Sequence, residues 1–131
     1  MRLKEYLRDL LMPDKQLNEE DLFEMSNLTK DETGLELTVW VSVKQHSSGP
    51  RVKVNFDSSL TFDKGNNFSV SISNEPFVVA GGTEKEIKKR IGAKKLDDVY
   101  DWVVQNSEVL LKYWNSEIST KKMTDEIKEL K

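Results

Sequence analysis

The chain contains no cysteine and a single histidine among its 131 residues. The absence of cysteine excludes disulfide bonds, thiolate zinc sites and a cysteine nucleophile. One histidine, His46, excludes a site in which several histidines of one chain hold a metal ion. We therefore expect neither a metal centre nor a bound cofactor.

The chain also has no apolar run long enough to span a bilayer. Charges are mixed into the first residues, Met1 to Tyr6, which is not the pattern of a signal peptide. We expect no membrane association and a cytoplasmic location. The net charge of −3 and the pI near 5.3 disfavour general nucleic-acid binding, because such proteins are usually basic.

The clearest pattern is an alternation of apolar and polar residues over residues 34 to 56. Such alternation is typical of strands with one buried face. The cluster Ser47-Ser48-Gly49-Pro50 interrupts it with residues that favour turns. We therefore expect a central β-hairpin whose inner face is formed by Leu35, Leu37, Val39, Val41, Val43, Val52, Val54 and Phe56.

Further strands are expected on both sides of this hairpin. Phe68, Val70 and Ile72 alternate with three serines, and residues 77 to 80 are wholly apolar. Residues 21 to 28 fit a helical turn or a short strand, and the turn-like residues 29 to 34 that follow favour the strand. Short turns join antiparallel neighbours. The pattern therefore predicts an antiparallel sheet of four to five strands.

Apolar residues recur at helical spacing toward both ends of the chain. Residues 2 to 12 carry four leucines on one stripe, and a long helix is expected from about residue 95 to residue 115. Thr83 and Glu86 have the spacing of a capping box, which predicts a short helix that ends near Gly92.

The apolar face of the long helix is interrupted by Asn106. A buried amide is costly unless it is hydrogen bonded, so we expect Asn106 to bond a neighbouring backbone or a tryptophan N–H. Ser119 or Thr120 suits the start of a last helix. The buried stripe of that helix is expected to contain Met123, Ile127 and Leu130.

Strands and helices are segregated along the chain, which is typical of an α+β fold. We predict an antiparallel four- to five-stranded sheet built on the central hairpin and packed by the long C-terminal helix, with short N- and C-terminal helices. The length suits a single domain over residues 1–131. Its expected parts are an N-terminal helix and connector (1–30), the sheet (34–80) and a helical part (83–131).

Trp40 is on the strand face opposite the apolar set, and Arg51 and Lys53 have the same position in the next strand. An aromatic ring beside cations on an open sheet face suits a nucleobase or a side chain of a partner. The alternative is that the flanking helices cover this face too. We predict a binding surface made of Trp40, Arg51, Lys53 and His46, which lies in the hairpin turn.

A second candidate is a run of cations in residues 84 to 95. Together they suit phosphate neutralisation, which makes nucleic-acid binding the alternative function. Glu84 and Glu86 dilute the run, and charge runs on short helices are usually solvated faces. The cations are Lys85, Lys88, Lys89, Arg90, Lys94 and Lys95.

No residue pattern predicts catalysis. Ser47 and Ser48 follow His46, but no orienting acid or nucleophile-elbow pattern accompanies them. The acidic pair Asp97-Asp98 has no second cluster at the spacing of a hydrolase pair. We therefore expect a non-enzymatic protein that binds a protein partner.

Residues 33 to 120 resemble a family of small uncharacterised bacterial proteins. The resemblance depends on Thr33-Gly34-Leu35, Val39-Trp40-Val41-Ser42, Gly49-Pro50-Arg51-Val52-Lys53-Val54, Val78-Val79-Ala80-Gly81-Gly82, Trp102-Val103, Asn106, Leu110-Leu111, Tyr113-Trp114 and Glu117-Ile118-Ser119-Thr120. A shorter family of prokaryotic domains of unknown function is similar in its hairpin followed by a helix ending in Leu-Leu-x-x-Trp. The resemblance implies no activity, and it implies a link to toxin–antitoxin or mobile-element loci.

Overall fold

The computed structural model describes residues 25–44, 49–63 and 65–130. The helix expected over residues 2 to 12, the first part of the segment from 21 to 28, and His46 lie outside these described residues.

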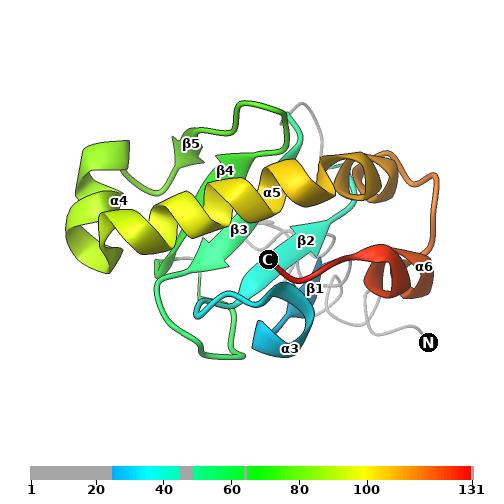
Figure 1. Ribbon diagram of the computed structural model, residues 1–131, viewed down its shortest axis with the longest axis horizontal. Coiled ribbons are helices and arrows are strands. Elements are labelled where there is room, and N and C mark those ends of the chain that lie inside the picture. The colour runs from blue at the N-terminus through cyan, green and yellow to red at the C-terminus, as the bar shows by residue number, and fades with distance from the viewer. Residues whose placement is uncertain (1–24, 45–48, 64, 131) are drawn as a thin grey trace, which may run out of the picture.

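Five antiparallel strands form one sheet in the order of the sequence (Figure 1). The strands are β1 (Met25–Leu28), β2 (Val39–Ser42), β3 (Arg51–Asn55), β4 (Asn67–Ser71) and β5 (Val78–Ala80). This confirms the predicted α+β fold with an antiparallel sheet around a central hairpin. The ambiguous segment before residue 29 is a strand over its described part.

The strand register separates the sheet into an apolar face and a polar face. Val39 pairs with Val54, which pairs with Phe68. Val52 pairs with Val70 in the next row. These five side chains are at most 1% exposed. Alternation of side chains along each strand therefore directs the apolar set to one face, which forms the core.

Two local predictions about the hairpin region need correction. Residues 29 to 34 were expected to be a turn, but Lys30–Thr33 forms a one-turn helix, α3, with Thr29 and Glu32 in a capping box. The first hairpin strand was expected from Leu35, but regular pairing begins at Val39. Leu35 is still buried. Leu35 therefore belongs to the alternating apolar pattern without being part of a strand, because a side chain can pack on the core without strand pairing.

The short basic helix α4 (Glu84–Ile91) begins where the sequence predicts it. Thr83 Oγ1 accepts a hydrogen bond from Glu86 N at 3.1 Å, and Glu86 Oε1 accepts one from Thr83 N at 2.8 Å. The bond from the Thr83 backbone lowers the pKa of the Glu86 carboxyl. Before the helix, Gly81 has φ of +93°, and a Cβ there would lie 2.6 Å from Phe68 Cα. This close approach requires glycine.

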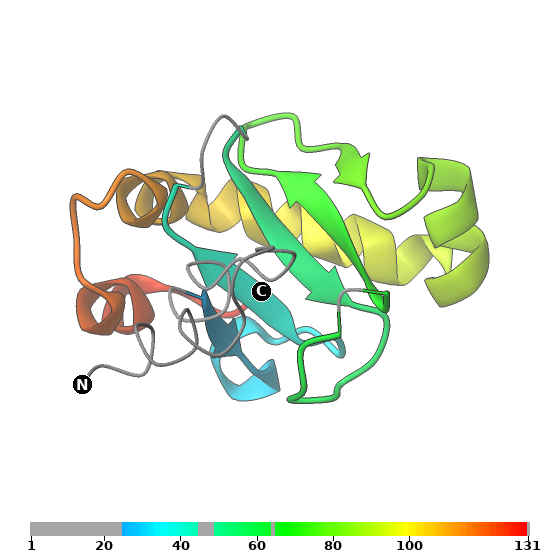
Figure 2. The same cartoon turned by 180° about the vertical axis from the view of Figure 1, so that it is seen from behind.

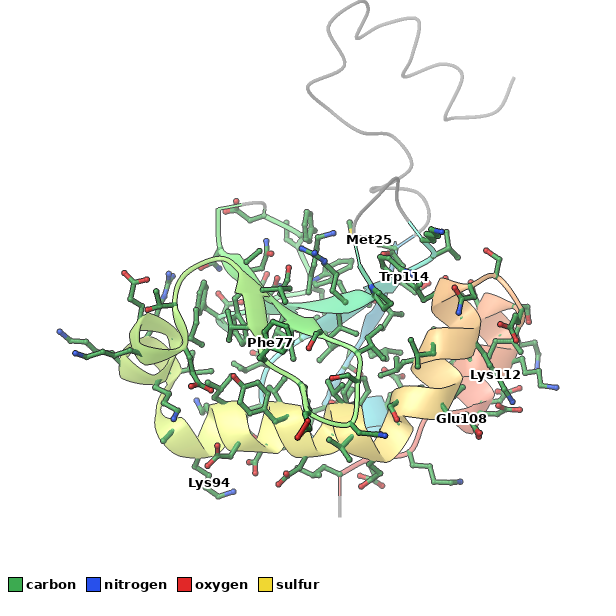
Figure 3. The ribbon with its side chains drawn as sticks, turned by 90° about the horizontal axis from the view of Figure 1, so that it is seen from above. Met25, Phe77, Lys94, Glu108, Lys112 and Trp114 are labelled. Atoms are coloured by element: carbon green, nitrogen blue, oxygen red, sulfur yellow. The ribbon has the colours of Figure 1, made fainter. Side chains whose placement is uncertain are left out.

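The long helix α5 (Ala93–Trp114) lies across the apolar face of the sheet, so that the two form separate layers (Figures 1 and 3). Its bounds agree with the predicted range within two residues. Its buried residues are Leu96, Val99, Trp102, Val103, Asn106, Val109, Leu110, Tyr113 and Trp114. The helix thus supplies the cover that the apolar face requires.

The last helix, α6 (Thr120–Glu126), is capped by Ser119, whose side chain accepts a hydrogen bond from Lys122 N. Met123 is fully buried, as expected. The prediction that Ile127 and Leu130 continue this helix was wrong, because the chain is extended at Ile127. The segment from 127 to 130 is instead held by hydrogen bonds to α5 and to Thr33.

Candidate functional site

The polar face of the sheet, opposite α5, carries the three described residues of the predicted binding surface. Trp40 on β2 pairs directly with Lys53 on β3. Arg51 lies two residues before Lys53, and side chains two apart point to the same face of a strand. The structure therefore brings Trp40, Arg51 and Lys53 together, while His46 lies outside the described residues.

Within the described ranges, no helix covers this polar face. The α5 helix lies on the opposite face, and α4 and α6 lie at the two ends of the sheet (Figure 2). The N-terminal helix expected over residues 2 to 12, the other element that could cover this face, lies outside the described residues. We call the polar face the outer face of the sheet.

Trp40 is held in place by the loop that follows β3. Its Nε1 donates a hydrogen bond to Asn55 Oδ1 at 3.2 Å, and Phe62 packs edge-on against its ring at 5.4 Å between centroids. Asn55 Nδ2 in turn donates to the backbone oxygens of Ser59 and Thr61. The indole N–H is therefore already engaged, and the ring of Trp40 is half-buried.

Arg51 and Lys53 are half-buried cations in the middle of the outer face. Arg51 Nε donates to the backbone oxygen of Gly49 at 3.2 Å, which orients the guanidinium. Arg51 pairs with Ser71, and Lys53 pairs with Ser69, on β4. Two long cationic side chains thus lie beside two short hydroxyl side chains.

One exposed aromatic residue, beside the edge strand β5, was not predicted from the sequence. Phe77 precedes β5 and is 59% exposed. Its backbone N–H donates to Ser71 Oγ at 3.0 Å, and Ser71 N donates to the Phe77 backbone oxygen at 2.9 Å. In the sequence, Phe77 belongs to a short apolar stretch. That position predicted a buried side chain and not an exposed one.

Two cations of the basic run of residues 84 to 95 take part in contacts with other side chains. Arg90 lies over the ring of Phe56 at 3.7 Å from the centroid, and its Nη2 donates to Asn66 Oδ1 at 2.8 Å. Lys94 pairs with Asp98 at 3.0 Å. Both side chains thus take part in contacts of the fold, whereas Lys85, Lys88 and Lys89 are exposed on α4.

Lys95 belongs to a hollow of about 290 Å³ between the start of α5 and the segment before β2. Lys94 and Asp98 line the same hollow, together with Glu36. A hydrogen bond from Lys30 lowers the pKa of the Glu36 carboxyl. Two lysines and two carboxylates line this hollow, so it has no single sign of charge for a ligand.

Among the described residues, no group of three or more His, Asp or Glu side chains is arranged to hold a metal ion. None of the described helices combines the length and the apolar character that crossing a membrane requires. Comparison of the chain with protein-family models, curated proteins and solved structures gave no match.

Proposed function

We propose that the protein is a non-enzymatic protein-interaction module that binds its partner through the outer face of the sheet. Trp40, His46, Arg51 and Lys53 are the proposed contact residues. The observation that carries the proposal is the cross-strand pairing of Trp40 with Lys53 on the face opposite α5. Tryptophan and arginine are over-represented among the residues that dominate binding energy at protein interfaces.

We also propose that the protein is located in the cytoplasm and that its function is linked to a toxin–antitoxin or mobile-element locus. This setting rests on the resemblance of residues 33 to 120 to small bacterial proteins. Nucleic-acid binding through α4 is the alternative function. It is supported by the exposed cations Lys85, Lys88 and Lys89, and weakened by the contacts that engage Arg90 and Lys94.

The proposal is tested by affinity purification under native conditions, with protein and nucleic acid both identified in the eluate. The test variant is Arg51→Glu/Lys53→Glu, and the matched control is Lys88→Glu/Lys89→Glu, which reverses two positive charges on α4. We expect a stoichiometric protein partner with the wild type and the control. The variant Arg51→Glu/Lys53→Glu is expected to retain less than roughly a tenth of the partner that the wild type binds. Losing one dominant contact costs about 2 kcal/mol of binding free energy.

Charge reversal is a cleaner test than truncation of Trp40. Trp40→Ala also removes the contacts with Phe62 and Asn55, so it releases the loop after β3 as well as the binding surface. Retention of the same partner by the outer-face variant would contradict the proposal. Nuclease-sensitive nucleic acid that is lost with the α4 variant, and lost at moderate salt, would establish the alternative, because displaced counterions drive such binding.

A further inference from the structure

The loop that joins β3 to β4 (Figure 2) carries a leucine in solvent. Leu60 is 61% exposed, which makes it the most exposed of the large apolar side chains in the described ranges. It lies next to the outer face, because Phe62, two residues later, packs against Trp40 of that face. Single exposed leucines are common on protein surfaces, so what matters is how firmly the loop holds this one.

A buried amide fixes the backbone on both sides of Leu60. Asn55, the last residue of β3, is 1% exposed. Its Nδ2 donates to the backbone oxygen of Ser59 at 3.0 Å and to that of Thr61 at 3.3 Å. These oxygens belong to the residues immediately before and after Leu60. The sheet therefore sets the position of the Leu60 backbone.

Short-range hydrogen bonds add to this hold. Asp57 Oδ1 accepts a hydrogen bond from Ser59 N at 3.0 Å, and Ser59 Oγ accepts one from Thr61 N at 3.1 Å. A loop that is already ordered loses little conformational entropy when a partner covers it. Leu60 is thus an exposed apolar side chain on a preorganised loop. We call residues 57 to 63 the Leu60 loop.

Carboxylates flank Leu60 at equal distances along the chain. Asp57 lies three residues before it and Asp63 three residues after it, and both are exposed. The Leu60 loop contains no lysine, arginine or histidine. Because charges across an interface are arranged to be complementary, a surface that matches this loop has an apolar pocket for the leucine and positive charge at the rim of that pocket.

Building on the proposed function, we propose that the partner is a protein with an apolar pocket, bordered by lysine or arginine, that receives the side chain of Leu60. Trp40 then also supports the Leu60 loop, because its ring contacts Phe62 and its indole N–H bonds Asn55. Nucleic acid fits less well, since the carboxylates of the loop repel its phosphates.

The test measures the affinity of purified variants for the partner protein that the wild type recovers, by isothermal titration calorimetry. We expect Leu60→Ser to raise the Kd about tenfold or more. Leu60→Met keeps an apolar side chain of similar size and is expected to retain the wild-type Kd within about threefold. The matched control is Val104→Ser, which changes another exposed apolar residue, 42% exposed and on α5, and is expected to leave the Kd unchanged.

The positive rim of the pocket is tested by Asp63→Asn. Asp63 Oδ1 accepts a hydrogen bond from Gly65 N at 2.9 Å. An asparagine oxygen can accept the same bond, so the loop keeps this contact while it loses one charge. We expect Asp63→Asn to raise the Kd about threefold at low salt and to bind like the wild type at high salt, because salt screens exposed charges. An unchanged Kd at low salt would overturn the positive rim.

Urea denaturation of each variant is the control for folding, and Leu60→Ser is expected to leave the midpoint unchanged because the side chain is exposed. Wild-type affinity of Leu60→Ser for a partner that depends on Arg51 and Lys53 would overturn this inference alone. Loss of binding by Leu60→Ser, without loss by Arg51→Glu/Lys53→Glu, would support this inference and contradict the contacts of the proposed function. If neither variant affects binding, or if the wild type recovers no protein, both proposals fail.

Discussion

At the scale of single residues, Asn106 holds the C-terminal segment onto α5. It is 3% exposed. Its Nδ2 donates to the backbone oxygen of Lys128 at 3.0 Å, and its Oδ1 accepts from Lys128 N at 2.9 Å. Trp102 Nε1 donates to the same backbone oxygen at 3.1 Å. One buried amide thus bonds both backbone polar groups of Lys128, in the segment that follows α6.

We predict that Asn106→Ala lowers the free energy of unfolding by about 2–3 kcal/mol, because it leaves Lys128 N–H without its partner and removes buried hydrogen bonds. Urea denaturation measures this loss. The matched control is Gln105→Ala, whose exposed side chain bonds the same segment and is expected to cost less than about 1 kcal/mol. Equal losses for the two variants would show that Asn106 has no special role in holding the segment.

At the scale of elements, Tyr100 links the long helix α5 to the short helix α4. Its hydroxyl donates to Glu84 Oε1 on α4 at 2.7 Å. Burial and this hydrogen bond raise the pKa of Tyr100 well above its ordinary value of 10.0. The folded state therefore favours the neutral phenol and binds its proton more tightly than the unfolded chain does.

This raised pKa predicts a loss of stability at alkaline pH. The contribution of Tyr100 is fully present below about pH 10 and is lost as the pH rises toward the folded-state pKa, because the unfolded chain then binds fewer protons. The free energy of unfolding is expected to fall more steeply between pH 9.5 and roughly pH 11.5 in the wild type than in Tyr100→Phe. Denaturation curves across this range provide the measurement. Parallel curves for the two proteins would show that the link between α4 and α5 does not depend on the phenol proton.

At the scale of the whole molecule, one core connects the sheet with α4, α5 and α6. Its buried residues include Val54 of β3, Ile87 of α4, Trp102 of α5 and Met123 of α6. No boundary between two cores separates these elements in the described part of the chain. This supports the proposal of a single domain.

We predict that the protein unfolds in one cooperative transition, because its elements share a core. Tryptophan fluorescence reports on Trp40 at the outer face and on the buried Trp102 and Trp114, while circular dichroism reports on the helices. The two signals are expected to give the same midpoint and slope in urea. Two separated transitions would instead indicate that the helical part and the sheet fold independently.

Local chemistry in the sequence was sufficient to predict most elements. Alternation along β2, β3 and β4 predicted the buried face, because side chains in strands point alternately to opposite faces. The capping box at Thr83 and Glu86 predicted the start of α4, because the interacting groups are three residues apart. The burial of Asn106 was also predicted from its place on an apolar helix face. All of these features depend on residues that lie close together in the sequence.

Features that depend on distant partners were decided by the tertiary structure. The sequence indicated that Asn106 needs a hydrogen-bonding partner, but that partner, Lys128, is 22 residues away. It also indicated a basic run without showing that Arg90 packs on Phe56. The register of β3 with β4 places Ser71 beside Arg51, and two hydrogen bonds join Ser71 to Phe77. Periodicity determines which face a side chain occupies, whereas only pairing determines which side chains lie beside it.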